Sequence, residues 1–240
     1  MENALLIALS RQTVMERHME VLSNNIANAS TPGFKGEQLM FVEYLAQTPG
    51  GDSVSYVQDL ALVRDFSEGD FTTTGNPLDV AIHGKGWFVI DTPEKQAYTR
   101  NGHFTLNAKG QIVTSRGNPV LSASGAPITV GPGETGIEIS SDGTVSTRSG
   151  VKGQLKIVTF RDEKALTKAS NSLYVTDVTP DAAIKSEVVQ GAIEGSNVEP
   201  IIEVSNMINA LRSYQSAQEV IVGDDGLLRQ AISVITDQQT

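Results

Sequence analysis

The chain has 240 residues, enough for one or two domains with a sizeable core. Its 18 Lys and Arg residues against 28 Asp and Glu residues give a net charge of -10, which argues against nucleic acid or an anionic lipid surface as a partner. The chain contains no cysteine, which excludes disulfides and thiolate chemistry and leaves the redox compartment open.

The N-terminus does not resemble a membrane anchor or a cleaved leader. No apolar run approaches the roughly 18 residues that a membrane-spanning helix needs, so we expect no membrane insertion. The apolar run at residues 4–9 lacks a preceding basic stretch, because Glu2 stands there, and no small-residue cleavage site follows it. We therefore expect no cleaved signal peptide.

A helix is predicted over the first part of the chain. Between residues 5 and 26, apolar side chains recur at steps of three and four, the spacing of a seam that one helix buries against another. Only Gln12 breaks the pattern. Pro32 disfavours helical geometry at the residue before it and Gly33 permits a turn, so we expect the helix to end there. The predicted seam consists of Leu5, Ala8, Met15, Met19, Leu22 and Ile26.

The middle of the chain is predicted to be β structure. Residues 46–56 indicate a linker within an extended arm that covers residues 36–77. Asn101 and Gly102 are a strong signal for a two-residue hairpin. The spacing of strands and turns predicts a β domain at residues 78–195, folded as a small antiparallel barrel or sandwich. The first strands are expected at residues 78–82, 87–90, 97–100, 103–106 and 111–114.

A second long helix is predicted near the C-terminus. Ser196 and Asn197 are good N-caps and Pro200 suits a first turn, so we expect the helix to cover residues 200–237. It repeats the seam spacing of the first helix, with Gln218 out of pattern. The predicted seam consists of Val204, Met207, Leu211, Tyr214, Ile221, Leu228, Ile232 and Ile235.

Two glycines interrupt this second helix. Gly223 and Gly226 flank Asp224 and Asp225, and each glycine costs a helix about 1 kcal/mol. We therefore predict a kink, or a break into two helices, at this point. Together with Pro32 and Gly33, these two glycines are the candidate hinge or turn residues.

The two ends and the middle together predict an α+β fold. The terminal helices are expected to pack as a coiled-coil-like pair, and residues 1–35 and 196–240 to form one helical assembly domain. The first lysine is Lys35 and the last is Lys185, so both helical ends lack lysine.

The first helix carries mostly amides and hydroxyls at its polar positions. A solvated helix normally carries Lys and Glu in pairs, whereas amides and hydroxyls can be buried between neighbours without desolvating a charge. We therefore interpret both seams, with Asn25 and Asn28, as subunit-interface residues. The alternative is a helical hairpin that covers one side of the β domain of the same chain.

The sequence offers no catalytic, cofactor-binding or metal-binding constellation. His18, His83 and His103 have no second ligand at metal-binding spacing. The glycines of residues 84–86 lie between two predicted strands with no helix to receive a phosphate, so they indicate a tight turn. We expect a protein that is not an enzyme and that needs no cofactor or metal.

Four segments resemble one protein family, the rod and hook proteins of the bacterial flagellum. They appear in the order of that family and cover much of the chain outside residues 122–190. The segments are residues 24–35 (NNIANASTPGFK), residues 74–82 with 84–88 (TGNPLDVAI and GKGWF), residues 98–104 (YTRNGHF) and residues 195–198 (GSNV).

The resemblance implies a structural role. In this family the terminal helices of neighbouring subunits form the inner tube of an axial filament, and the β domain lies outside it. Hook subunits are longer and the smallest rod subunits lack the β domain, so the length implies a rod subunit. The compact chain and residues 191–198 are more like a proximal-rod subunit; a distal-rod subunit is the alternative.

The resemblance also implies partners and a location. It implies contacts with proximal and distal rod proteins, export through the flagellar type III apparatus without a cleaved signal, and a position in the rod within the periplasm. There the rod transmits torque and encloses the export channel. It implies no nucleic acid, membrane insertion or small-molecule substrate. The rivals from other classes are a secreted β-domain binding module or adhesin, and a hydrolase, for which no converging nucleophile and base are visible.

Overall fold

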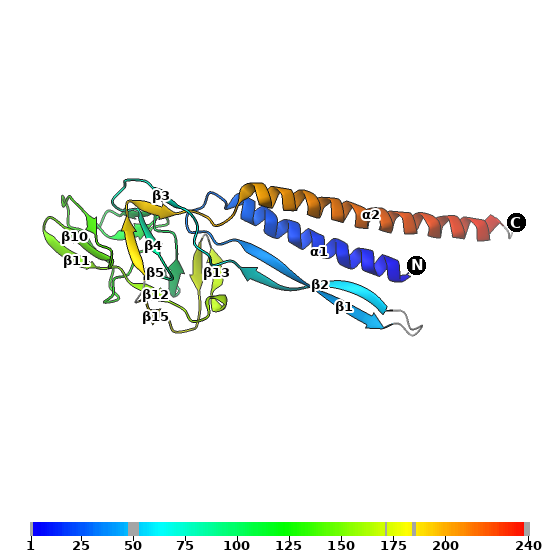
Figure 1. Cartoon of the computed structure of the whole chain (residues 1–240), viewed down its shortest axis with the longest axis horizontal. Coiled ribbons are helices and arrows are strands. Elements are labelled where there is room, and N and C mark those ends of the chain that lie inside the picture. The colour runs from blue at the N-terminus through cyan, green and yellow to red at the C-terminus, as the bar shows by residue number, and fades with distance from the viewer. Residues whose placement is uncertain (1, 48–52, 171, 184–185, 238–240) are drawn as a thin grey trace. The chain divides into compact units, whose positions relative to one another are not determined.

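The computed structural model divides the chain into two compact units (Figure 1). It describes residues 2–47, 53–170, 172–183 and 186–237. We call the first the helical unit, formed by Met1–Ala27, Glu37–Arg64 and Glu199–Thr240. The second, the β unit, is formed by Asn28–Gly36 and Asp65–Val198. The predicted α+β class is confirmed. The units differ from the expected domains, because residues 28–36 and 196–198 belong to the β unit and residues 37–64 of the predicted arm belong to the helical unit.

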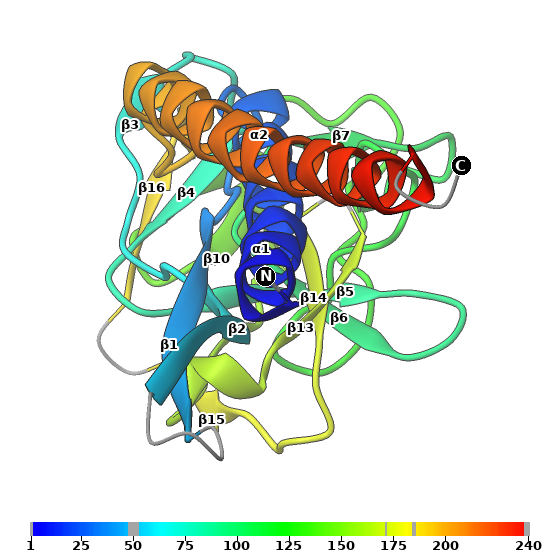
Figure 2. The same ribbon diagram turned by 90° about the vertical axis from the view of Figure 1, so that its right-hand side faces the viewer.

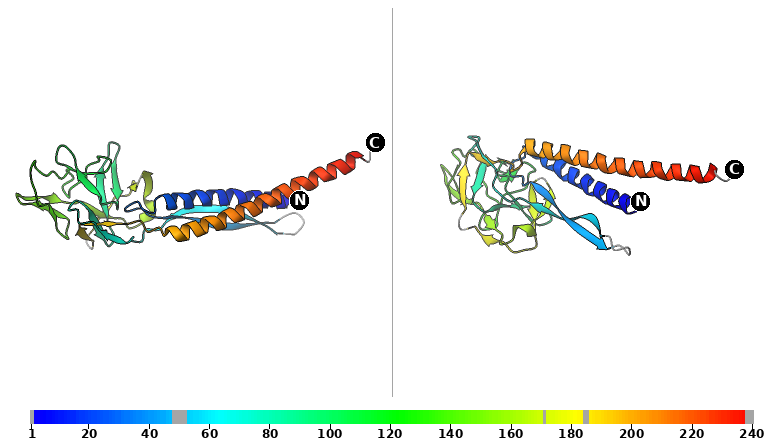
Figure 3. Two further views of the ribbon diagram at one scale, coloured as in Figure 1. Left: turned by 90° about the horizontal axis from the view of Figure 1, so that it is seen from above. Right: turned by 45° about the vertical axis from the view of Figure 1, so that its right-hand side comes forward.

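The helical unit combines two helices and a β-hairpin (Figure 3). Helix α1 (Glu2–Ala27) lies beside helix α2 (Pro200–Asp237), and α1 also contacts the hairpin of strands β1 (Glu37–Gln47) and β2 (Ser53–Arg64). The hairpin is antiparallel with a register shift between Met40 and Phe41. Helix α1 therefore has a neighbour on two sides within its own unit.

The hairpin occupies much of the arm that the sequence predicted as extended. The predicted linker at residues 46–56 is wrong at both of its ends, because β1 runs to Gln47 and β2 starts at Ser53; residues 48–52 lie outside the described part of the chain. Val54 and Tyr56 are residue types that favour strands, and they outweigh the serines beside them.

Helix α2 is continuous through Gly223 and Gly226 (Figure 2). The predicted break into two helices is therefore wrong. The cost of about 1 kcal/mol per glycine is small for a helix of 38 residues, and glycine keeps the backbone N–H and C=O groups that helical hydrogen bonds need. The helix also starts without the predicted cap from Asn197, whose side chain is bound inside the β unit.

The β unit contains fifteen named strands in several small sheets. The largest sheet has six antiparallel strands in the order β13-β14-β6-β5-β12-β15, and the described strands form no closed barrel. The strands are β3 (Phe71–Thr73), β4 (Val80–His83), β5 (Trp87–Asp91), β6 (Gln96–Thr99), β7 (Phe104–Leu106), β8 (Ile112–Thr114), β9 (Glu138–Ile139), β10 (Thr144–Thr147), β11 (Gly150–Gln154), β12 (Ile157–Thr159), β13 (Thr167–Ser170), β14 (Leu173–Val175), β15 (Asp181–Ala182), β16 (Glu187–Gln190) and β17 (Ala192–Glu194); a short 3-10 helix, η1, covers Glu163–Ala165.

Apolar clusters cover both faces of the six-stranded sheet. Along β5, Trp87 and Val89 pack into one cluster, and Phe88 and Ile90 pack into the other. All four side chains are at most 1% exposed, which agrees with the alternation of side chains across a strand. The unbroken apolar run at residues 87–90 thus reflects a strand buried on two sides.

The hairpin expected at Asn101 and Gly102 does not form. Strand β6 pairs with β5 and β14, whereas β7 pairs with β8. A two-residue turn of the expected type needs positive φ at both positions, and neither residue has it. Instead the Gly102 carbonyl accepts a hydrogen bond from the Val80 amide at 3.0 Å, which holds this bend against β4.

The last strands of the β unit pair with its first ones. Strand β16 pairs with β4, and β17 pairs with β3, so residues near 190 complete sheets that begin near residue 72. Because the final pairing partners are more than 100 residues apart in sequence, the β unit closes only when both ends of its segment are present.

Candidate functional site

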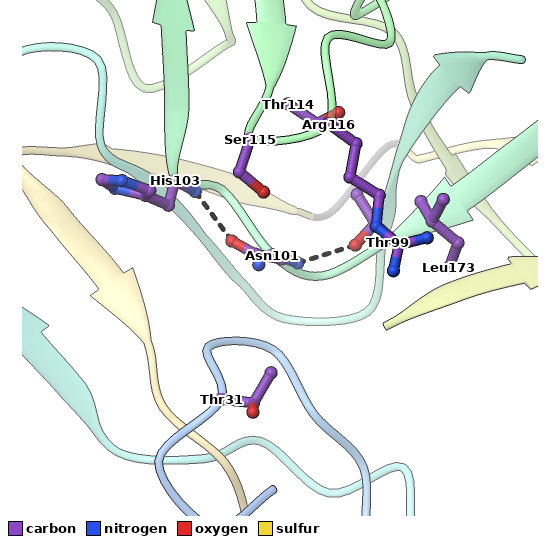
Figure 4. Close-up of a pocket in the computed structure, with 8 residues that line it drawn as sticks. All are labelled: Thr31, Thr99, Asn101, His103, Thr114, Ser115, Arg116 and Leu173. Carbon is purple, nitrogen blue, oxygen red and sulfur yellow. Dashed lines mark hydrogen bonds between the residues drawn. The ribbon is translucent and has the colours of Figure 1, made fainter. Parts of the chain in front are cut away.

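A polar cavity in the β unit lies beside a bend of the chain that hydrogen bonds hold in place (Figure 4). It has a volume of about 160 Å³. The Nδ1 atom of His103, which lines it, lies 2.7 Å from the buried Asp79 carboxylate, and the Asn101 carboxamide oxygen accepts from the His103 backbone amide at 3.0 Å. Asp79 also accepts hydrogen bonds from Thr74 and Asn76. These contacts hold the loop, and none of them activates a nucleophile.

The other two histidines also have structural neighbours. His83 Nδ1 lies 3.3 Å from Glu68 Oε2 on the β unit. His18 packs edge-on against the ring of Phe41 in the helical unit, and burial lowers the pKa of His18 while Glu203 opposes that change. Among the residues that the structure describes, no group of three or more His, Asp or Glu side chains could hold a metal ion.

The predicted seam on α1 lies mostly in the interior of the helical unit. Ala8 and Leu22 are buried, and the rest of that seam is half-buried: Leu5, Met15, Met19 and Ile26. Val14, which the seam omitted, is also buried. Leu6 and Leu9 are about half exposed, at 49% and 52%, so α1 keeps an apolar edge that its own chain does not cover.

Helix α2 carries two stripes one residue apart. Apart from Ser213, the described residues of α2 with reduced exposure form its inner seam, at steps of four and three: Glu203, Met207, Ala210, Tyr214, Ala217 and Ile221. Five of the large apolar residues that remain exposed form its outer stripe, Ile201, Val204, Ile208, Leu211 and Val222, while Ile202 and Val220, each 51% exposed, lie on another side of the helix. Successive helical residues are about 100° apart, so the two stripes face different directions.

The predicted α2 seam combines members of both stripes. Met207, Tyr214 and Ile221 belong to the inner seam, whereas Val204 and Leu211 lie on the outer stripe and are 44% and 45% exposed. The side chains of Leu228, Ile232 and Ile235 lie outside the described part of the chain. The sequence pattern missed Ala210 and Ala217, which are the two buried residues among the described side chains of α2.

Asn25 joins three elements of the helical unit. Its side-chain amide nitrogen donates to the Glu37 carbonyl at 2.8 Å, and its oxygen accepts from the Glu37 backbone amide at 3.0 Å. The same nitrogen donates to Glu203 Oε2 on α2 at 3.0 Å. Glu37 in turn forms an ion pair with Arg64 at 2.7 Å, across the base of the hairpin. This predicted interface residue is thus already committed within its own chain.

The segment after α1 is anchored in the β unit. Asn28 accepts a backbone hydrogen bond from Thr31, and Gly33 adopts a φ of 66° that L side chains rarely adopt. The Gly33 amide donates to the Glu194 carbonyl at 2.8 Å. Phe34 is 1% exposed, and the Lys168 ammonium lies 4.5 Å from its ring centroid.

A buried ion cluster holds the two ends of the β unit together. The Lys35 ammonium lies 2.6 Å from Glu194 Oε1, and both side chains are fully buried. Lys35 also donates to the Ser67 carbonyl at 2.5 Å, and the Gly69 amide donates to Glu194 Oε1 at 3.2 Å. Burial lowers the pKa of Lys35, and the Glu194 carboxylate opposes that change.

Arg100 supplies the second positive charge of the cluster. Its Nη1 atom lies 3.6 Å from Glu194 Oε2, and its guanidinium donates to the carbonyls of Ile82 at 3.1 Å and Gly84 at 2.8 Å. It also lies over the Trp87 ring, 5.9 Å from the centroid. Arg100 therefore connects the charge of Glu194 to both β4 and β5.

Asn197 ties together three points where the chain passes between the units. Its side-chain oxygen accepts from the Gly36 amide at 2.8 Å, and its nitrogen donates to the Asp65 carbonyl at 2.9 Å. The Asp65 amide also donates to the Gly36 carbonyl at 2.9 Å. Gly36, Asp65 and Val198 are boundary residues of the β unit. The Asn197 carboxamide, next to Val198 in sequence, bonds both Gly36 and Asp65 and so holds three chain ends of the β unit close together.

Three family models match the chain in successive segments. The flagella basal body rod protein model matches residues 5–35, the flagellar hook protein FlgE/F/G D1 domain model matches residues 81–147, and the flagellar basal body rod FlgEFG protein C-terminal model matches residues 189–234. These segments cover most of α1, several strands of the β unit, and most of α2.

Similar proteins match almost from end to end. The chain is 36% identical to the flagellar basal-body rod protein FlgF of Caulobacter vibrioides, over 97% of each chain. It is 34% identical to FlgF of Rhizobium meliloti over 98% of each chain, and 31% identical to the rod protein FlgG of Bacillus subtilis over 98% of this chain and 99% of that one. The chain belongs to the family of flagellar basal-body rod and hook proteins.

This family consists of structural proteins, so the chain is a structural protein and not an enzyme. The predicted resemblance is thereby confirmed. No helix in the described ranges is long and apolar enough to cross a membrane.

We expect Gly33→Ala to destabilise the β unit more than Gly117→Ala. Both glycines have positive φ, but a Cβ at Gly33 would collide with the backbone of Arg100 and Asn101, whereas nothing lies within 4 Å at Gly117. Gly117→Ala should cost about 1 kcal/mol for its backbone conformation, and Gly33→Ala should exceed that by at least 1–2 kcal/mol. Equal losses in chemical unfolding would contradict the close packing at Gly33.

We expect Lys35→Met to cost about 3–5 kcal/mol, because it leaves the Glu194 carboxylate buried with one cation fewer. The matched control is Lys95→Met, which removes an exposed ion pair with Asp177 and should cost at most about 1 kcal/mol. Trp87 is the only tryptophan and is buried in the β unit, so its fluorescence reports the unfolding of this unit. Similar unfolding midpoints for the two variants would show that the ion cluster of Lys35, Glu194 and Arg100 is not essential for the stability of the β unit.

Proposed function

We propose that the chain is a structural subunit of the flagellar basal-body rod, in its proximal part. The observation that carries this proposal is the outer stripe of α2, whose large apolar side chains are exposed in the single chain. Apolar surface gathered in this way marks a protein-interaction site. In a rod, that stripe would be covered by the helices of neighbouring subunits.

The proximal rod is favoured over the distal rod by the similarity to relatives. The proteins named FlgF are 33–36% identical to this chain, and those named FlgG are 30–32% identical. The margin is small, and the distal rod is the second candidate. The compact length of 240 residues favours the proximal type of the family.

The two terminal helices would pack as a coiled-coil-like pair through the inner seam of α2. Steps of four and three along this seam support such packing, and Ala210 and Ala217 allow the helix backbones to approach closely. The β unit, with apolar clusters on both faces of its main sheet, would form a small sandwich outside the tube.

The other predicted interface residues would take part in contacts between neighbouring subunits. Leu5, Met15, Met19, Ile26 and Met207 are half-buried in the single chain and would lose their remaining exposure on assembly. A contact between two different faces of a subunit does not close on itself and therefore generates a helical array. Such an array encloses a channel, and dense packing between its subunits gives the stiffness that torque transmission requires.

The partners and location follow from the same proposal. The neighbours would be proximal and distal rod proteins, and the subunit would leave the cytoplasm through the flagellar type III export apparatus, without a cleaved signal, to reach the periplasm. Gly223 and Gly226 would permit a bend of α2 where it meets unlike neighbours. The rival proposal from another class is a secreted binding module. Such a protein would be a monomer with its outer stripe exposed, and substitutions in that stripe would not affect swimming.

We expect Leu211→Asp to abolish swimming. Leu211 is 45% exposed, so the substitution leaves the single chain intact, but in an assembled rod it would bury an unpaired carboxylate at a cost of several kcal/mol. Met19→Asp should have the same effect. Lys109→Glu, at an exposed turn of the β unit, is the control and should swim normally.

Swimming is measured in cells whose only copy of the protein is the variant, and the folding of the β unit is checked by Trp87 fluorescence. Normal swimming by a Leu211→Asp strain with the variant present in its basal bodies would refute a packed interface at the outer stripe.

A further inference from the structure

The polar cavity of the β unit holds a positive charge without a counter-charge. Of the eight residues that line it, seven are polar and none is Asp or Glu (Figure 4). Arg116 supplies the charge, and its Nη1 atom donates to the neutral hydroxyl of Ser170 at 2.5 Å. No carboxylate in the described part of the chain pairs with Arg116. Most N–H groups of this guanidinium are therefore available to a ligand.

The Asn101 carboxamide adds donors beside this charge. Its oxygen accepts a hydrogen bond from the His103 backbone amide at 3.0 Å, which determines the side on which the oxygen lies. The two N–H groups of Nδ2 consequently point the other way, and no residue within the described ranges accepts from them. Asn101 thus offers the cavity hydrogen-bond donors and keeps its acceptor for its own loop.

The hydroxyls of the cavity are of two kinds. That of Thr99 is already used, because it donates to the Ser172 carbonyl at 2.8 Å and accepts from the Asn101 backbone amide at 3.0 Å. By contrast, the Thr114 hydroxyl is buried and has no hydrogen-bond partner among the described residues. Ser115 adds a second hydroxyl, which points toward Asn101 in Figure 4. A buried hydroxyl without a partner is unfavourable, so the Thr114 hydroxyl calls for a polar occupant of the cavity.

We propose that this cavity binds an oxyanion, either a carboxylate or a phosphate, through the Arg116 guanidinium, the Asn101 Nδ2 group and the Thr114 hydroxyl. An oxyanion carries acceptor atoms and a negative charge, so it pairs with every unused donor, and its bonds to a guanidinium are charge-assisted. A cation would be repelled by Arg116, and an apolar group would leave the donors unpaired.

The size of the cavity agrees with a small ligand. Its volume of about 160 Å³ is well below the roughly 300 Å³ at which pockets for larger organic ligands begin. All the residues that would hold the anion belong to the β unit, so a single chain contains the whole site. The inference therefore goes beyond the proposed function and is tested without an assembled rod.

Binding is measured on the purified full-length chain by NMR, in separate titrations with inorganic phosphate and with acetate at constant ionic strength. The side-chain N–H signals of Arg116 and Asn101 should shift together and saturate. The dissociation constant should be below roughly 10 mM for at least one of the two anions. Shifts that do not saturate with either anion would overturn the proposal.

Three variants test the named donors. Arg116→Gln should raise the dissociation constant at least tenfold, followed at the Asn101 signals. Asn101→Asp keeps the acceptor for the His103 amide but replaces the donors with a negative charge, so it should abolish binding at the Arg116 signal. Lys109→Gln removes an exposed charge of the same unit away from the cavity, and it should bind like the unchanged chain. Equal weakening by Arg116→Gln and Lys109→Gln would overturn the proposal.

A second experiment distinguishes a free anion from a carboxylate of a neighbouring protein, and this experiment alone rests on the proposed function. Carbodiimide joins carboxylates to nearby amines, so Arg116→Lys places a reactive amine in the cavity. In isolated basal bodies, a cross-link from residue 116 to an Asp or Glu of another chain would identify a protein carboxylate as the ligand. Saturable binding by the free chain with no such cross-link would identify a free anion. Absence of the chain from basal bodies would refute the rod proposal and leave the NMR result standing.

Discussion

The buried carboxylate of Glu194 is the constraint on which the rest of the β unit depends. A charge with no exposed surface costs several kcal/mol unless it is paired, so every partner of Glu194 must be in place at once. Those partners come from three distant parts of the chain, namely Lys35, Gly69 and Arg100. The cluster therefore makes the segment after α1 an integral part of a fold that is otherwise built from residues 65–198.

This constraint also fixes the residues at which the hairpin and α2 leave the β unit. Lys35 directly precedes Gly36, and Glu194 lies three positions before Asn197, whose side chain bonds both Gly36 and Asp65. The hairpin and α2 thus begin at points fixed within the β unit, while α1 ends just before Asn28.

The sequence predicted the elements better than their partners. Both helices were predicted, and strands β4 to β8 were placed to within about two residues, because apolar spacing and β-branched runs are local signals, whereas β1, β2 and β3 were missed. The pairing at Asn101 was wrong because a local turn preference yielded to the contact of Gly102 with β4. The seam on α2 merged two stripes, since alanine at Ala210 and Ala217 gives little apolar signal next to Leu211. The ion cluster gave no signal at all, because Lys35 and Glu194 are separated by 159 positions and each looks like an ordinary surface charge.

The most direct test of this account is native-state hydrogen exchange at the amides of Gly33 and Gly69. Both amides donate to Glu194, one to its backbone carbonyl and one to its carboxylate. If the cluster closes the β unit, these amides should exchange only through global unfolding, with the same opening free energy as the amides of β5. Exchange at Gly33 and Gly69 many times faster than in β5, while the unit stays folded, would show that the junction opens locally and would contradict the central role of Glu194.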